Sequence, residues 1–128
     1  MKFLLDTCTF LWLALEPERL SDNAIRILDD PVSSLHLSDV SIWEIVLKNT
    51  AGKLPLPDVP HEWVPEQIAH WQLETLPISQ SAIYGSGKLP KVHADPFDRL
   101  IAACAMESGF TLLSPDHPLS SLGAARIW

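Results

Sequence analysis

The segment HADPFDRLIAACAMESGFTLLSPD, residues 93–116, contains a helix followed directly by a strand. Asp95 is a side chain that caps helix N-termini, and apolar residues recur at helical spacing after it. Gly109 suits the left-handed backbone that ends many helices. A short apolar run follows and closes in a turn at Asp116. The segment therefore predicts a helix over residues 96–108 and a buried strand over residues 110–114.

The same alternation of strand and helix occurs along the rest of the chain. Residues 3–5 are typical of a strand buried on both faces of a parallel sheet, and residues 7–15 predict a helix that is apolar almost all round. The other predicted elements are a helix capped by Ser21 and limited by Pro31, a strand at 35–37, a helix at 38–48 with an apolar stripe of Val40, Trp43 and Leu47, a loop at 52–60, a helix through Val64, Ile68 and Trp71, a strand at 73–78, a turn at 85–90 and an edge strand at 126–128. This order predicts a single α/β domain over residues 1–128, with a central, mostly parallel sheet and helices on both faces.

Composition restricts the class of protein. The chain has 128 residues, 47% of them apolar, and a net charge of -7, which suits one folded domain. No apolar run approaches the ~18 residues of a membrane span, and the apolar start of the chain is too short for a signal peptide. Cys8 and Cys104 lie in apolar segments, so we expect buried free thiols in a reducing compartment. These features predict a cytoplasmic protein with no membrane partner.

Four acids, Asp6, Glu44, Asp98 and Asp116, are expected to meet at one edge of the sheet. Ligands of open parallel sheets bind outside the carboxyl ends of the strands, near the point where the strand order reverses. Asp6 and Asp116 each follow an apolar strand, and Glu44 and Asp98 lie near helix N-termini. Acids that converge without matching Lys or Arg repel one another and favour a bound cation. Oxygen ligands at this density favour Mg²⁺ or Mn²⁺.

Each of these acids also has a purely local explanation. Common placement at one sheet edge is the only property that the local explanations do not predict. In those explanations Asp6 caps the helix that follows it, Ser41 and Glu44 form a capping box, Asp98 is favoured by the helix dipole, and Asp116 forms an Asx turn. For a fifth acid, Asp95, the helix cap is a sufficient role, and a supporting role in the site, shared with Arg99, is the alternative.

Five short runs occur in order along nearly the whole chain. They are LLDT at 4–7, SIWEIVLK at 41–48, GKLPL at 52–56, HADPFDRLIAA at 93–103 and LLSPD at 112–116. Together they resemble the VapC-type toxins of the PIN-domain family, and HADPFDRLIAA is the most specific of them. PIN domains use an acidic quartet in this order. The resemblance therefore implies catalytic and metal-binding roles for Asp6, Glu44, Asp98 and Asp116, with Thr7 and Ser114 as supporting hydroxyls.

The resemblance also implies an activity and its partners. It implies an endoribonuclease toxin that is held inactive by a cognate antitoxin and assembles as a homodimer. Water activated by Mg²⁺, or by Mn²⁺ in its place, is expected to hydrolyse the RNA phosphodiester bond. Asp6 and Asp98 are expected to hold the principal ion, and Glu44 and Asp116 a second ion or the water. Many relatives have His at the position of Cys8 and Thr near Ser114.

The acidic composition conflicts with a polyanionic substrate, because nucleic-acid-binding proteins usually carry clustered Lys and Arg. A cation in the crevice would supply positive potential where the phosphate lies. Basic residues around it would then guide the flanking nucleotides, although Arg99 can equally form an ordinary ion pair on a helix surface. The basic residues in question are Lys48, Lys53, Lys88, Lys91 and Arg99.

Other functions stay open. A PIN-like module that binds RNA or protein without catalysis would typically lack one of the acids, and none is missing. A Mg-dependent phosphotransfer domain would phosphorylate Asp6, but it needs Lys and Ser or Thr at later strand ends. A zinc hydrolase would use His93, Asp95 and His117, although no paired His or Cys spacing supports it. The apolar helix at 10–15 suggests a partner surface for the antitoxin or a second copy.

Overall fold

A five-stranded, wholly parallel sheet lies at the centre of the computed structural model, which describes residues 1–128. The strand order is β3-β2-β1-β4-β5, with β1 in the middle. The strands are β1 (Lys2–Leu5), β2 (Ser34–Ser38), β3 (Glu74–Leu76), β4 (Thr111–Leu113) and β5 (Arg126–Ile127). The predicted parallel sheet is confirmed, and β5 is the edge strand expected at the C-terminal end of the sequence.

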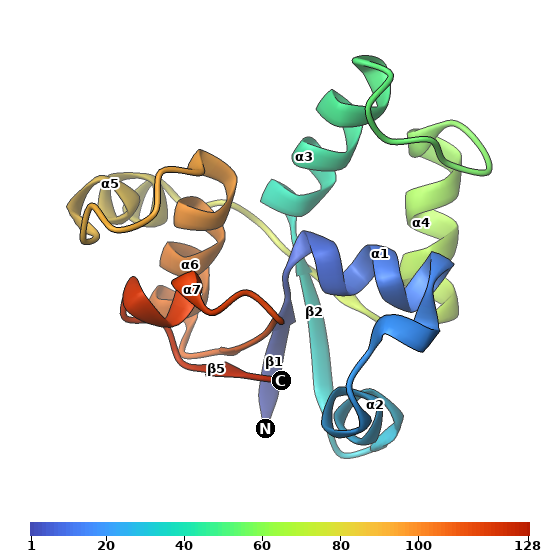
Figure 1. Ribbon diagram of the computed structural model, residues 1–128, viewed down its shortest axis with the longest axis horizontal. Helices are drawn as coiled ribbons and strands as arrows, with labels where there is room; N and C mark the ends of the chain where they lie inside the picture. The colour runs from blue at the N-terminus through green and yellow to red at the C-terminus, as the bar shows by residue number, and fades with distance from the viewer.

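Helices cover both faces of this sheet, as predicted (Figure 1). On one side lie α1 (Thr7–Leu15), α2 (Asp22–Asp29) and α4 (Pro60–His70), and on the other lie α5 (Gln80–Lys88), α6 (Pro96–Ser108) and α7 (Pro118–Ser121). α3 (Asp39–Thr50) follows β2 and stands over the carboxyl ends of the strands. The sequence did not predict α7 or the short 3₁₀ helix Pro17–Arg19. None of the helices has the length and apolar character needed to cross a bilayer.

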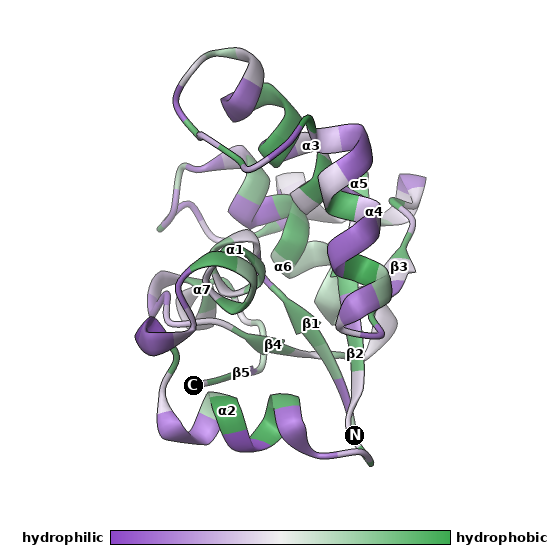
Figure 2. Cartoon of the chain, turned by 90° about the vertical axis from the view of Figure 1, so that its right-hand side faces the viewer, coloured by the Kyte–Doolittle hydropathy of each residue, from purple (hydrophilic) through white to green (hydrophobic).

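The central strands contribute to two separate apolar cores. Leu4 and Leu112 pack with α6, whereas Leu5 and Leu113 pack with α1 and α4. All four leucines are fully buried, because successive strand residues face opposite sides of a sheet that is covered on both. In Figure 2 the middle strands are accordingly hydrophobic, while α2 alternates hydrophobic and hydrophilic residues. The continuous apolar runs of the sequence thus match strands buried on both faces.

The boundaries of α6 follow the capping residues that the sequence indicates. The Asp95 side chain accepts hydrogen bonds from the backbone N–H groups of Phe97 and Asp98 at 2.8 and 3.2 Å. Gly109 ends the helix with a left-handed φ of 71°. Ser21 likewise caps α2 by accepting the N–H of Ala24 at 3.0 Å. Local capping therefore fixed these helix ends, as predicted.

Several local predictions were wrong. A turn was expected from Gly85 onward, but α5 continues to Lys88, because Ser79 caps it and the burial of Ala82 outweighs the low helix propensity of glycine. The N-cap of α3 is Ser38, so there is no capping box at Ser41. Of the two free cysteines, which were both expected to be buried, Cys104 is buried and Cys8 is partly exposed.

Gly85→Ala should stabilise the protein by about 0.5–1 kcal/mol, because a helical alanine loses less backbone entropy on folding than glycine does. An added Cβ at Gly85 would meet no atom within 4 Å. Gly109→Ala is the matched control. Its Cβ also has space, but its φ of 71° is strained for alanine, so it should destabilise the protein by about 1 kcal/mol. Urea unfolding measures the free energy of unfolding of both variants. A loss of stability in Gly85→Ala would contradict the helical conformation of α5 at Gly85.

Candidate functional site

The carboxyl ends of three neighbouring strands lie side by side at one edge of the sheet. The parallel register aligns Leu5 of β1 with Leu37 of β2 and with Leu113 of β4. The chain runs from β1 through β2 to β3 on one side and places β4 on the other, so the strand order reverses between β1 and β4. Ligand crevices of open α/β sheets form at such a point. The residues that follow the aligned leucines are Asp6, Ser38 and Ser114.

Asp6 is buried at this reversal, and both of its carboxylate oxygens are held. Oδ1 accepts the N–H of Thr9 at 2.8 Å, so Asp6 does cap α1. Oδ2 accepts the hydroxyl of Ser114 at 2.5 Å, and the Ser114 oxygen in turn accepts the N–H of Asp116 at 3.0 Å. Burial raises the pKa of Asp6, and the bonds from Ser114 and Thr9 only partly oppose that rise. Ser114 therefore couples Asp6 to the loop that carries Asp116.

Glu44 reaches the same place from the second turn of α3. Its Oε1 accepts the hydroxyl of Thr7 at 2.5 Å, and the Thr7 hydroxyl also lies 3.0 Å from Ser41 Oγ. Its Oε2 pairs with the ammonium of Lys48 one turn later, which raises the pKa of Lys48. The expectation of acids without a matching base is therefore wrong for Glu44.

The pKa of Asp98 is raised by burial and by neighbouring acids. Burial raises its pKa from 3.8 to about 6, and the charges of Asp95, Asp116 and Glu44 act in the same direction. The hydrogen bond from His93 opposes them. The charges of these three acids thus add to the effect of burial, and a bound cation would offset them.

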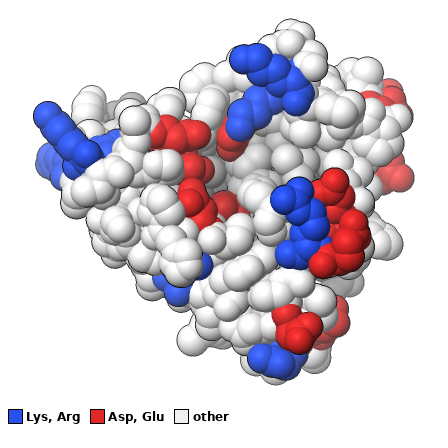
Figure 3. All heavy atoms as spheres, viewed as in Figure 1, with Lys and Arg blue, Asp and Glu red and all other residues white.

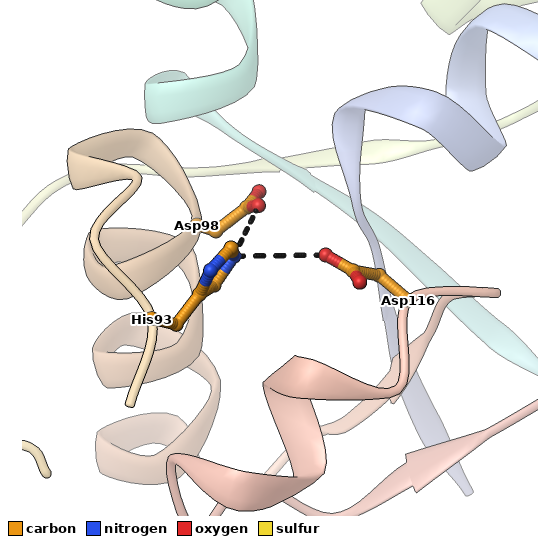
Figure 4. Close-up of side chains that lie close together, drawn as sticks. All are labelled: His93, Asp98 and Asp116. Carbon is orange, nitrogen blue, oxygen red and sulfur yellow. Dashed lines mark hydrogen bonds and ion pairs between the residues drawn. The ribbon is translucent and has the colours of Figure 1, made fainter. Parts of the chain in front are cut away.

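His93, which the sequence offered only as a ligand of a zinc site with Asp95 and His117, lies instead beside Asp98 and Asp116. Its Nε2 lies 2.8 Å from Oδ2 of Asp98 and 3.7 Å from Oδ2 of Asp116 (Figure 4). The Asp116 carboxylate thus faces His93 and makes no Asx-turn bond. The zinc triad weighed for the sequence does not form, because Asp95 caps α6 and His117 Nδ1 contacts Arg126 at 3.0 Å.

Arg99 holds the segment that carries His93. Its guanidinium donates hydrogen bonds to four backbone carbonyls, and it forms no ion pair, so the predicted surface ion pair is wrong. The side chain closes the loop between α5 and α6 around itself, with a bond of 3.1 Å to the carbonyl of His93. The other accepting carbonyls belong to Ser86, Leu89 and Pro90, at 2.7–2.9 Å.

The structure brings the four predicted acids into the lining of one cleft of about 340 Å³. Figure 3 shows acidic atoms gathered in a hollow on this face, with basic atoms on the surface around it. The donor set of carboxylates and one imidazole fits a divalent cation. The ligand atoms of His93, Asp98 and Asp116 lie within 4.8 Å of one another. Thr7, Lys48 and Asp95 also line the cleft.

Comparison with known proteins identifies the family. The sequence model of the PIN domain matches residues 3–124. The chain belongs to the PIN domain family. This PIN domain is 29% identical over 119 residues to Ribonuclease VapC22 of Mycobacterium tuberculosis, with 92% of this chain and 89% of that protein covered. The family resemblance seen in the sequence is therefore confirmed.

Solved structures show the same fold. VapBC2 from Rickettsia felis, bound to a DNA fragment from its promoter, has a TM-score of 0.73 and 15% identity, with 99% of this chain and 98% of that chain covered. DNA-bound VapBC from Salmonella typhimurium has a TM-score of 0.70 and 20% identity, with 100% and 97% covered. At such identities the likeness shows the fold alone.

Asp98→Asn should stabilise the metal-free protein at neutral pH, because the fold disfavours the ionised carboxylate. With a pKa raised from 3.8 to about 6, folded Asp98 holds its proton more tightly than the unfolded chain does. Its contribution to stability is therefore fully present below pH about 4 and is lost as the pH rises through about 6. We expect the variant to gain about 1–3 kcal/mol at pH 8 and nothing near pH 4, by urea unfolding in EDTA.

Asp29→Asn, on the exposed end of α2, is the control and should leave the pH dependence as in the wild type. A net loss of stability in Asp98→Asn at pH 8 would mean that the hydrogen bond with His93 outweighs the cost of burial.

Proposed function

We propose that this PIN domain is a metal-dependent endoribonuclease toxin that cleaves RNA by water attack and is neutralised by a cognate antitoxin. The observation that carries the proposal is the convergence of Asp6, Glu44, Asp98 and Asp116 in one cleft of a PIN domain. The similarity to a protein named a ribonuclease, which covers 92% of the chain, supports the same activity. We place the protein in the cytoplasm, where its RNA substrate would be.

The four acids are the proposed catalytic and metal-binding residues. A bound Mg²⁺, or Mn²⁺ in its place, would stabilise charge on the phosphate and lower the pKa of a coordinated water. The geometry favours Asp98 and Asp116 as its principal ligands, because their side chains face each other across His93. Asp6, the expected partner of Asp98, stays a proposed ligand, because each of its oxygens keeps a lone pair beyond the one that accepts from Thr9 or Ser114.

Residues in and around the cleft orient these groups. Ser114 fixes the Asp6 carboxylate, and Thr7 fixes Glu44. Lys48 lines the cleft beside Glu44 and offers a positive charge to an incoming phosphate. Asp95 and Arg99 act through the backbone, since Asp95 starts the helix that carries Asp98 and Arg99 holds the loop of His93.

Water is the proposed nucleophile, since no side chain in the cleft suits that role. Cys8 lines the cleft, but burial and the charge of Asp6 raise the pKa of its thiol to about 12. The thiol is therefore protonated at neutral pH and is a weak nucleophile. A phosphotransfer role for Asp6 is disfavoured, because the residue is only 4% exposed and lies among further acids in the cleft.

An apolar stripe on α3 supports the proposed homodimer. Trp43 and Leu47, which were expected to face the core beside Val40, are 52% and 44% exposed, and Val46 lies on the same helix face. The apolar surface of α1 supports a partner less well, because Phe10 is buried and Trp12 is covered by Arg19 and Trp128. We propose the α3 stripe as the contact between two copies.

Antitoxin-free protein should cleave RNA in the presence of Mg²⁺ or Mn²⁺, and Asp6→Asn or Asp98→Asn should lower the rate at least about 100-fold. Gel analysis of structured RNAs measures the cleavage rate. The toxicity of expressing the protein should disappear in the same two variants. Asp29→Asn, an exposed acid on α2, is the matched control and should keep full activity. Equal cleavage by Asp6→Asn would reveal a contaminating nuclease and contradict the proposal, and no cleavage of any RNA would favour a binding module.

Sedimentation should give about twice the chain mass of 14.2 kDa, and Leu47→Lys should shift the protein toward monomer, because it places a charge in the proposed contact. Val59→Lys, at an apolar residue of similar exposure outside α3, should leave the dimer intact. A monomeric wild type at micromolar concentration would contradict the proposed homodimer.

A further inference from the structure

We propose that His93 is itself a ligand of the divalent ion, together with Asp98 and Asp116, and that this nitrogen makes the site prefer Mn²⁺ to Mg²⁺. The inference rests on the metal site of the proposed function, but it does not depend on RNA being the substrate. It concerns the identity of the metal that this PIN domain selects.

The distances fit a shared ion. Neighbouring ligand atoms held at about 2.1 Å from a metal lie about 3 Å apart. Nε2 of His93 is 2.8 Å from Oδ2 of Asp98 and 3.7 Å from Oδ2 of Asp116. Figure 4 shows the ring turned toward both carboxylates, one from α6 and one from the loop after β4. A simple ion pair with Asp98 would not require the imidazole to face a second acid.

Each of the three residues is fixed through its own backbone. The carbonyl of His93 accepts a hydrogen bond from Arg99, the N–H of Asp98 is held by the Asp95 cap, and the N–H of Asp116 is held by the Ser114 hydroxyl. Although His93 lies in a loop between two helices, its side chain is only 21% exposed. The group is therefore pre-organised, as a metal site needs to be.

The nitrogen ligand determines the preference. Mg²⁺ is held by oxygen ligands and water, whereas imidazole binds first-row transition-metal ions. A site built from two carboxylates and one imidazole should accordingly bind Mn²⁺ more tightly than Mg²⁺. Asp6 and Glu44, which line the same cleft, do not offset this preference, because carboxylate oxygens are suitable ligands for either ion.

The test uses the full chain and Mn²⁺ as a paramagnetic probe. Electron spin-echo modulation of the Mn²⁺-loaded protein should show coupling to a histidine nitrogen, and labelling the histidines with ¹⁵N should change it. His93→Gln should abolish this coupling and weaken Mn²⁺ binding at least about tenfold, while Mg²⁺ binding falls less than about threefold. His117→Gln is the matched control, since His117 is exposed next to Asp116 and contacts Arg126 instead of the acids.

The outcomes separate this inference from the proposed function. Mn²⁺ binding without nitrogen coupling, coupling that survives in His93→Gln, or an equal loss of Mn²⁺ and Mg²⁺ affinity would each overturn the role of His93 and leave the nuclease proposal standing. Absence of any Mn²⁺ binding would overturn both the role of His93 and the proposed metal site. Circular dichroism of His93→Gln verifies that the variant is folded.

Discussion

The hydroxyl of Ser114 and the carboxylate of Asp6 join two points that lie 108 residues apart in the sequence. This buried bond lies where β1 and β4 end side by side, at the reversal of the strand order. The same carboxylate starts α1, and the same hydroxyl holds the backbone of Asp116. Because both groups are buried, neither could be left unpaired without a large cost in free energy. The arrangement of the cleft therefore depends on this contact.

The burial of several acids close together is the main free-energy cost of the cleft. Asp98 has a pKa raised to about 6, and Asp6 also has a raised pKa, so the fold works against the ionised forms that would bind a cation. The ion pair with Lys48 stabilises the ionised form of Glu44, and the hydrogen bond with His93 does the same for Asp98. A bound cation would offset the free-energy cost of ionising these acids, so the proposed metal site and the raised pKa values are consistent with each other.

The segment between α5 and α6 shows how a loop can be made rigid without regular secondary structure. One guanidinium satisfies four carbonyls there, a use of arginine that depends on its planar set of donors. The loop thereby gains a fixed shape, and the His93 side chain is turned toward the acids. Arg99 belongs to the recognisable HADPFDRLIAA run, but its contacts are with the backbone and not with a neighbouring acid.

Elements that depend on local interactions could be predicted from the amino-acid sequence. Asp95 and Gly109 mark the ends of α6 because capping and left-handed backbone act within a few residues, and the apolar runs at β1 and β4 reveal strands buried on both faces. The four acids were found from their places beside such elements and from the family resemblance. Four features could be seen only in the folded chain: His93 faces Asp98 and Asp116, Lys48 pairs with Glu44, α5 passes through Gly85, and Trp43 and Leu47 face outward. Those features depend on contacts between segments far apart in the chain or on how a helix face packs against its neighbours. The local conformational preferences of the residues therefore do not predict them.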